Sequence, residues 1–173
     1  WKWAKGLQSR NLLQRNIKGN NNGMNTKELV HALCEEYHTN DPFELADSIG
    51  ITVTYEKLGL VQGFYNQCFR HKFIHINQDS SEEKQRFTCA HELGHAILHP
   101  EANSPFLREN TLFSIDKMEV QANRFAVDLL FSDYELQDYI ARPITDAARR
   151  MGVTIPLAEY RMKSVEPALF HTY

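Results

Sequence analysis

Residues 80–99, SSEEKQRFTCAHELGHAILH, decide the fold of this chain. Ser80, with Glu83 three residues later, predicts a capping box at the start of a helix. That helix contains an H-E-x-x-H pattern formed by His91, Glu92 and His95. At about 3.6 residues per turn, the two histidines project from one face, roughly one turn apart, so both imidazoles can bind the same metal ion.

Glu92 is the candidate catalytic residue of this pattern. It is rotated away from the histidines, so its carboxylate can lie beside the metal without binding it and accept a proton from water. The alternative is a surface helix with two solvated histidines. The helix is apolar over much of its circumference, which is typical of a buried helix. Burying two imidazoles and a carboxylate without a partner is costly, and a metal ion would supply that partner.

A hydrolytic zinc site needs a third protein ligand and an open position. Leu98 and Glu101 stand where the pattern H-E-x-x-H-x-x-G-x-x-H requires Gly and His, which excludes a third histidine of that type. His99 lies about 12 Å from His91 along a straight helix, too far to share the ion. A histidine at the end of a helix, near the negative end of its dipole, is the simpler interpretation.

A second helix, predicted over Ile115–Leu130, offers a glutamate as the third ligand. One stripe of this helix holds Glu119, Ala122, Asn123 and Ala126. The two alanines would let it approach the first helix closely. We expect Glu119 to bind the metal and Asn123 to orient a ligand histidine. The alternatives are a solvated Glu119 near the start of its helix, or a ligand from the predicted loop 100–114, which carries Glu101 and Glu109.

Composition and charge limit the class of protein. With 173 residues, 42% of them hydrophobic and 24% charged, the chain fits a globular domain. It lacks a run of 18 apolar residues, so no membrane span is predicted. Three cysteines without C-x-x-C spacing favour reduced thiols in a cytoplasmic protein. Residues 1–23 carry five basic and no acidic side chains and are interpreted as a vector-derived leader or linker; the remainder then has a net charge of −8, which disfavours non-specific nucleic-acid binding.

Short elements are predicted on either side of the H-E-x-x-H helix. On its N-terminal side we expect helices over 26–37 and 42–48 and strands over Ile51–Tyr55, Val61–Tyr65 and Phe69–Asn77, the last two joined through Asn66 and Gln67. If the last strand is the edge of the sheet, a peptide could pair with its backbone. On the C-terminal side, a helix capped by Ser132 or Asp133 should run to Tyr139.

Residues 144–165, ITDAARRMGVTIPLAEYRMKSV, predict a helical hairpin. Ala148, Gly152 and Val153 occupy the places of the small residue, turn glycine and apolar residue of a helix-turn-helix motif. The second helix carries Arg161 and Lys163 but also acidic residues. A DNA-reading helix is one interpretation; we favour a hairpin that packs on the core or docks a partner.

The sequence resembles the ImmA/IrrE metallopeptidases from Met24 onward. The resemblance rests on DPFELADSIGITVTYEKLG, GFY, FTCAHELGHAILH and MEVQANRFAVDLL, followed by the small hairpin. It implies an α+β, zincin-like fold in which a small twisted sheet accompanies the active-site helix. It also implies Zn²⁺ held by His91, His95 and Glu119, with Glu92 as the catalytic base. Asn123 stands where thermolysin-like zincins usually have Asp.

Members of this family look like cytoplasmic proteins, often of phages or mobile elements, that act on a helix-turn-helix repressor. This chain is similar to the short, mobile-element type. We therefore expect a metallopeptidase domain over 24–140 with a C-terminal helical appendage over 141–173. Cleavage of the repressor would derepress the element. A binding module that only masks the repressor and a DNA-binding regulator remain as the other two function classes.

Overall fold

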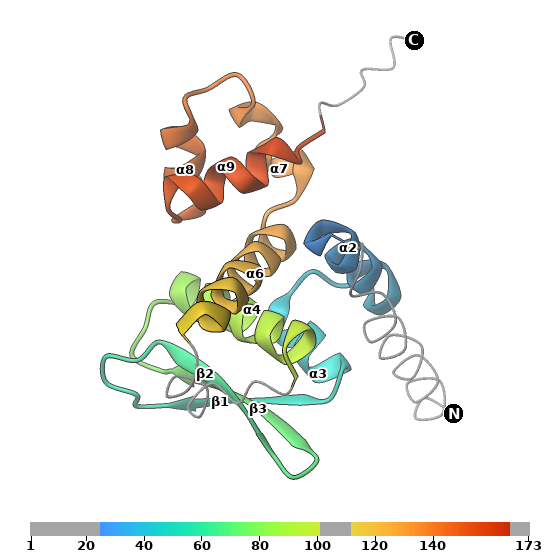
Figure 1. Cartoon of the computed structure of the whole chain (residues 1–173), viewed down its shortest axis with the longest axis vertical. Helices are drawn as coiled ribbons and strands as arrows, with labels where there is room; N and C mark the ends of the chain where they lie inside the picture. The colour runs from blue at the N-terminus through green and yellow to red at the C-terminus, as the bar shows by residue number, and fades with distance from the viewer. Residues whose placement is uncertain (1–24, 101–111, 167–173) are drawn as a thin grey trace.

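A small sheet, one long helix and then a second long helix form successive layers of the structure (Figure 1). This computed structural model describes residues 25–100 and 112–166; the predicted leader over 1–23 and residues 101–111 lie outside that range. The strands are β1 (Ile51–Glu56), β2 (Gly63–Cys68) and β3 (His71–Asn77). The helices are α2 (Thr26–Tyr37), α3 (Pro42–Ser48), α4 (Glu82–Leu98), α6 (Leu112–Leu130), α7 (Asp133–Leu136), α8 (Ile144–Met151) and α9 (Ile155–Lys163), with a 3₁₀ turn at Gln137–Tyr139.

The sheet has the order β1-β3-β2, with β1 parallel and β2 antiparallel to β3. The conditional expectation that the last strand forms the sheet edge is therefore wrong. β3 is central, and both of its edges are engaged by neighbouring strands, so no further strand can pair with it. The predicted turn is also wrong: Asn66 and Gln67 pair with β3, and the chain reverses at Phe69 and Arg70 instead. Phe69 takes a left-handed conformation there, with φ of 56°.

The sheet and α4 enclose the main hydrophobic core. Tyr65, Ile74 and Ile76 are fully buried on the face of the sheet that meets α4, and Leu93 is fully buried on α4 itself. α6 covers the opposite side of α4, while α2 packs on α6 and α3 on α4 and β1. The expected α+β class and the helices over 26–37 and 42–48 are confirmed.

The starts of two helices differ from the sequence predictions, and the structure chooses between the two caps predicted for a third helix. The N-cap of α4 is Ser81, whose side chain accepts from the Lys84 N–H, whereas the Ser80 hydroxyl bonds Gln62 at 2.7 Å. The expected capping box at Ser80 is therefore wrong. α6 begins at Leu112, so the end of the predicted 100–114 loop is helical. Ser132 caps α7 with a capping box to Glu135, which decides between the two predicted caps.

The C-terminal hairpin has a small core of its own. Its buried residues are Leu136, Ala147, Ala148, Met151, Ala158 and Val165. Gly152 ends α8 at a φ of 66°, a conformation that glycine adopts without strain. α9 packs on α6, and in Figure 1 the hairpin lies beyond the C-terminal end of α6, away from the sheet. The expected helical pair is therefore confirmed.

A buried arginine, Arg161, connects the C-terminal hairpin to the rest of the protein through hydrogen bonds. Arg161 is 1% exposed, and its Nη2 donates to the Phe131 carbonyl at 2.7 Å and also to Asp133. Asp133 in turn accepts from Lys27 of α2 at 2.7 Å. Arg161 is thus engaged inside the protein and cannot contact DNA phosphates, which weakens the DNA-reading interpretation of this helix. No helix within residues 25–100 and 112–166 is both long and apolar enough to span a membrane.

Candidate metal centre

Two neighbouring helices bring the candidate ligands together. α4 carries His91 and His95, and α6 carries Glu119, 24 residues further along the chain. A Cβ built on Gly94 would lie only 3.1 Å from the Ala122 Cα and 3.1 Å from the Phe125 Cβ. The two helices therefore approach closely because Gly94 has no side chain. The alanines of α6 were expected to serve this purpose, but the role of Gly94 was not foreseen; its position within H-E-L-G-H, opposite the stripe of α6, was the available signal.

The candidate ligand atoms form a tight triangle. His91 Nε2 lies 3.2 Å from Glu119 Oε2, and His95 Nε2 lies 3.4 Å from Glu119 Oε1. The two Nε2 atoms are 3.1 Å apart. Ligands at about 2.0–2.1 Å from a tetrahedral zinc ion are separated from one another by about 3.3–3.4 Å. The three side chains therefore lie close enough together to bind one metal ion.

The hydrogen bond of Asn123 determines which nitrogen of His91 faces this triangle. Asn123 Oδ1 lies 3.1 Å from His91 Nδ1 and accepts its N–H. A neutral imidazole then has its lone pair on Nε2, pointing toward His95 and Glu119. Two imidazole nitrogens and a carboxylate oxygen that converge in this way repel one another unless a cation or a proton lies between them. The donor set thus fits a divalent metal.

The charges of the triangle are coupled. Hydrogen bonds from His91 and then His95 hold the pKa of Glu119 well below its usual range, although its side chain is 44% exposed. Burial lowers the pKa of His91, but the hydrogen bond to Glu119 and the charges of Glu92 and Glu119 outweigh burial and raise it overall. Protons and a metal ion therefore compete for the same atoms, so metal binding should release protons.

Glu92 lies beside the triangle and is held by the sheet. Its side chain is buried, with the residue 7% exposed, and Oε2 accepts the backbone N–H of Tyr65 from β2 at 2.8 Å. Burial raises the pKa of Glu92, and the nearby His91 and His95 partly offset that rise. The contact with Tyr65 was missed by sequence reasoning because a backbone N–H leaves no mark on residue identity.

The remaining candidate ligands do not join the triangle. His99 is the C-cap of α4, and its ring centre lies 5.9 Å from that of His95. Burial, followed by the charge of His95, lowers the pKa of His99 to about 4. Within residues 25–100 and 112–166, the group of side chains able to hold a metal comprises His91, His95 and Glu119 without His99. Glu101 and Glu109 lie outside the described residues.

Comparison with known proteins agrees with this geometry. The Peptidase_M78 family model, described as the IrrE N-terminal-like domain, matches residues 46–163 and so includes both ligand-bearing helices and the hairpin. The chain belongs to this family of metallopeptidases, and the expected membership of the ImmA/IrrE group is confirmed.

Particular relatives place the chain within the family. It is 44% identical to the "Uncharacterized immunity region protein 2" of Bacillus phage phi105 over 138 residues, which are 78% of this chain and 87% of the relative. It is 31% identical to "Metallopeptidase ImmA" of Bacillus subtilis over 114 residues, 65% of this chain and 66% of that protein. A shorter match, 45% identical over 49 residues, links it to the "Radiation response metalloprotease IrrE" of Deinococcus deserti, covering 28% of this chain and 17% of that protein.

Proposed function

We propose that this protein is a zinc-dependent endopeptidase that cleaves a helix-turn-helix repressor and thereby derepresses a phage or mobile genetic element. The observation that carries the proposal is the triangle of His91, His95 and Glu119, with sides of 3.1–3.4 Å, beside a buried glutamate that does not belong to it. Two imidazoles and one carboxylate leave a fourth position of a tetrahedral ion open, as hydrolysis requires.

His91, His95 and Glu119 would hold the zinc ion, with Asn123 fixing the ring orientation of His91 through the 3.1 Å contact with Nδ1. A bound zinc ion supplies Lewis acidity, which polarises a peptide carbonyl and makes water more acidic. The zincin-like fold that the family resemblance implies is part of this proposal.

Glu92 would move the proton. The hydrogen bond from the Tyr65 N–H occupies Oε2 and fixes the carboxylate, leaving Oε1 to accept a proton from the attacking water. Glu92 would then return this proton to the nitrogen of the leaving amine. The raised pKa of Glu92, caused mainly by burial, brings the carboxylate closer to the pH at which a group can both accept and donate a proton.

The names of the relatives support the proposed substrate. One relative is an immunity region protein of a phage, and another is named a metallopeptidase. We infer a cytoplasmic role on a repressor protein of the same element. We also propose that the metallopeptidase domain covers 24–140, that the helical appendage covers 141–173, and that residues 1–23 are a vector-derived leader or linker.

Replacement of the base tests the enzyme. In Glu92→Gln we expect parental zinc content, measured by atomic emission, and loss of repressor cleavage by about 10²–10⁴-fold. A helix-turn-helix repressor that co-purifies with the chain from its host serves as substrate, and fragments are followed by mass spectrometry. Glu82→Gln, an exposed change in the first turn of the same helix, is the matched control and should cleave normally. Full cleavage by Glu92→Gln would remove Glu92 from its proposed role.

A second candidate is a non-proteolytic antirepressor that binds and masks the repressor. The observation that favours it is that the C-terminal hairpin has a hydrophobic core of its own and lies away from the sheet (Figure 1). Masking does not need Glu92, so derepression of a reporter gene by Glu92→Gln would support this second function. Loss of derepression together with loss of fragments would support the peptidase.

A further inference from the structure

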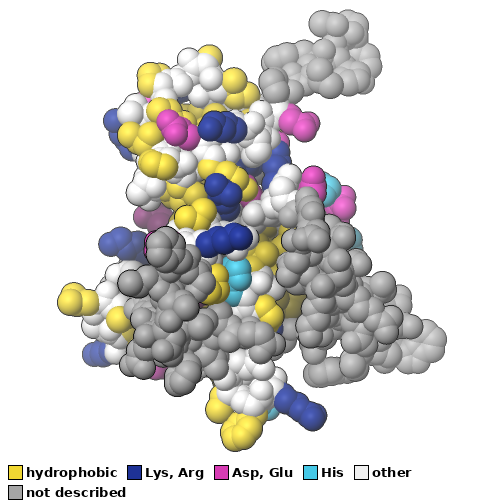
Figure 2. All heavy atoms as spheres, in the orientation of Figure 1, with side chains coloured by type: hydrophobic (Ala, Val, Ile, Leu, Met, Phe, Trp, Pro, Cys, Tyr) yellow, Lys and Arg dark blue, Asp and Glu magenta, His cyan; other side chains and the backbone are white. Residues whose placement is uncertain are grey.

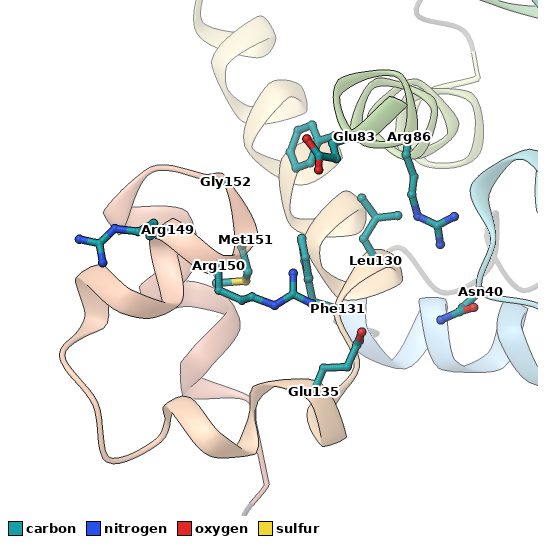
Figure 3. A pocket seen from close by; sticks show the side chains of 11 residues that line it. Asn40, Glu83, Arg86, Leu130, Phe131, Glu135, Arg149, Arg150, Met151 and Gly152 are labelled. Atoms are coloured by element: carbon teal, nitrogen blue, oxygen red, sulfur yellow. The ribbon is translucent and has the colours of Figure 1, made fainter. Parts of the chain in front are cut away.

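A groove lies between the body and the C-terminal hairpin, on a different part of the molecule from the metal triangle. It encloses about 450 Å³, a volume within the usual range for ligand sites. α4 forms one wall, the C-terminal end of α6 forms the floor, and the end of α8 forms the other wall (Figure 3). All of its lining residues belong to the described part of the chain.

The floor of this groove is apolar, and its walls carry three arginines, Arg86, Arg149 and Arg150, together with two glutamates, Glu83 and Glu135. Leu130 and Phe131 at the end of α6, with Phe87 of α4 and Met151 of α8, provide the apolar lining. In Figure 3, Arg86 on α4 and Arg150 on α8 extend from opposite walls, with Leu130 and Phe131 lying between them. Two guanidinium groups on either side of an apolar floor match a ligand that carries carboxylates beside a bulky apolar side chain.

The pairing of the charges in the groove favours an acidic ligand. Arg86 donates to Asp41 through one nitrogen, and a guanidinium has further N–H groups to donate. Arg150 is exposed and makes no ion pair within residues 25–100 and 112–166. Glu135, by contrast, already accepts from both the N–H and the hydroxyl of Ser132, each at 2.9 Å.

A peptide segment fits these features better than DNA does. Residues 24–173 carry a net charge of −8, which disfavours binding to the long anionic backbone of DNA. Figure 2 shows acidic and basic side chains interspersed over the hairpin on this face of the molecule, rather than a field of one sign. An apolar floor also gives nothing to a phosphate backbone.

We propose that this groove is a docking site for a protein partner, which inserts a segment carrying a bulky apolar side chain flanked by carboxylates. The proposal rests on the proposed function in one respect: the partner is taken to be the repressor, held here while another of its segments lies at the metal centre. Because α4 carries both Arg86 and His91, the two sites share one rigid helix. Docking would therefore fix the substrate relative to Glu92.

Selection from a library of random twelve-residue peptides tests the site. The full chain is the bait, and recovered peptides are labelled with fluorescein and titrated by anisotropy. We expect selected peptides to pair Asp or Glu with Leu, Phe or Trp, and to lose at least tenfold in affinity on Arg150→Glu. Arg70→Glu, an exposed arginine on the β2–β3 turn, is the matched control and should bind as the parent does.

The outcomes separate this inference from the proposed function. Peptide binding that survives Arg150→Glu, selection of basic peptides or recovery of no peptides would overturn the docking site. Salt-dependent binding of a 20-base-pair duplex that is lost in Arg150→Glu would instead assign the arginines to nucleic acid and overturn it as well. Neither result involves Glu92, so the Glu92→Gln experiment still decides the peptidase. Conversely, an inactive metal centre would leave the peptide titrations unchanged.

Discussion

Gly94→Ala is the most demanding test of how the metal centre is assembled. The added Cβ would lie 3.1 Å from the Ala122 Cα, 3.1 Å from the Phe125 Cβ and 3.3 Å from the Ala122 carbonyl oxygen. Ordinary carbon contacts lie at about 3.5–4.0 Å, so α4 and α6 must separate by about 0.4 Å. Metal sites tolerate ligand displacements of about 0.2 Å. The substitution therefore displaces Glu119 from its best position relative to an ion held by the two histidines.

The expected change in unfolding free energy follows from two opposing contributions, overpacking between the helices and the higher helix propensity of alanine. Overpacking costs about 1–3 kcal/mol, while replacing Gly by Ala within a helix returns about 1 kcal/mol. The metal-free variant should therefore lose about 0–2 kcal/mol of unfolding free energy, measured by urea denaturation in EDTA. Its zinc affinity, measured by competition with a chromogenic chelator, should fall by about 10–100-fold, the size seen when support around metal ligands is lost.

A matched control isolates the packing effect. Lys84→Ala lies at an exposed position of the same helix and should leave zinc affinity unchanged. A Gly94→Ala protein that is about 1 kcal/mol more stable than the parent and binds zinc with parental affinity would refute the reasoning. That result would mean that the approach of α4 to α6 does not set the position of Glu119.

Three further predictions address the surroundings of the site. Asn123→Ala should lower zinc affinity by about 10–100-fold in the chelator assay, because His91 loses the acceptor of its Nδ1–H; unchanged affinity would contradict this orienting role. Chelation of zinc with EDTA should lower the melting temperature in calorimetry, because a metal that binds only the folded state stabilises it; Glu119→Gln should show a smaller shift. Burial raises the pKa of Asp128 to about 6, more than the hydrogen bond from Tyr160 and the charge of Arg161 lower it. Asp128 therefore stabilises the fold fully below pH about 4 and loses this contribution as pH rises through about 6. Relative to the parent, Asp128→Asn should gain about 2–3 kcal/mol between pH 4 and pH 7 by urea denaturation; parallel pH profiles would contradict it.

The local features of the site could be predicted from sequence. The i, i+4 spacing places His91 and His95 on one face whatever the helix packs against, and the stripe on the second helix singles out Glu119. Helix caps such as Asp41 and Ser132 act within a few residues, so the helix boundaries that they set can also be predicted. The N-cap of α4 is Ser81 and not the predicted Ser80. This difference shows the limit of such signals, because either of two adjacent serines can cap a helix.

Long-range contacts were decided only by the tertiary structure. Strand alternation does not say which strand is central, so the placement of β3 between β1 and β2 could not be predicted. The bond from the Tyr65 N–H to Glu92 depends on a backbone group that every residue but proline has. The space opposite Gly94 exists only because α6 is there. Local sequence therefore determined which side chains could bind a metal, whereas packing between distant segments determined that they meet, because contacts between distant segments depend on how the whole core fills space.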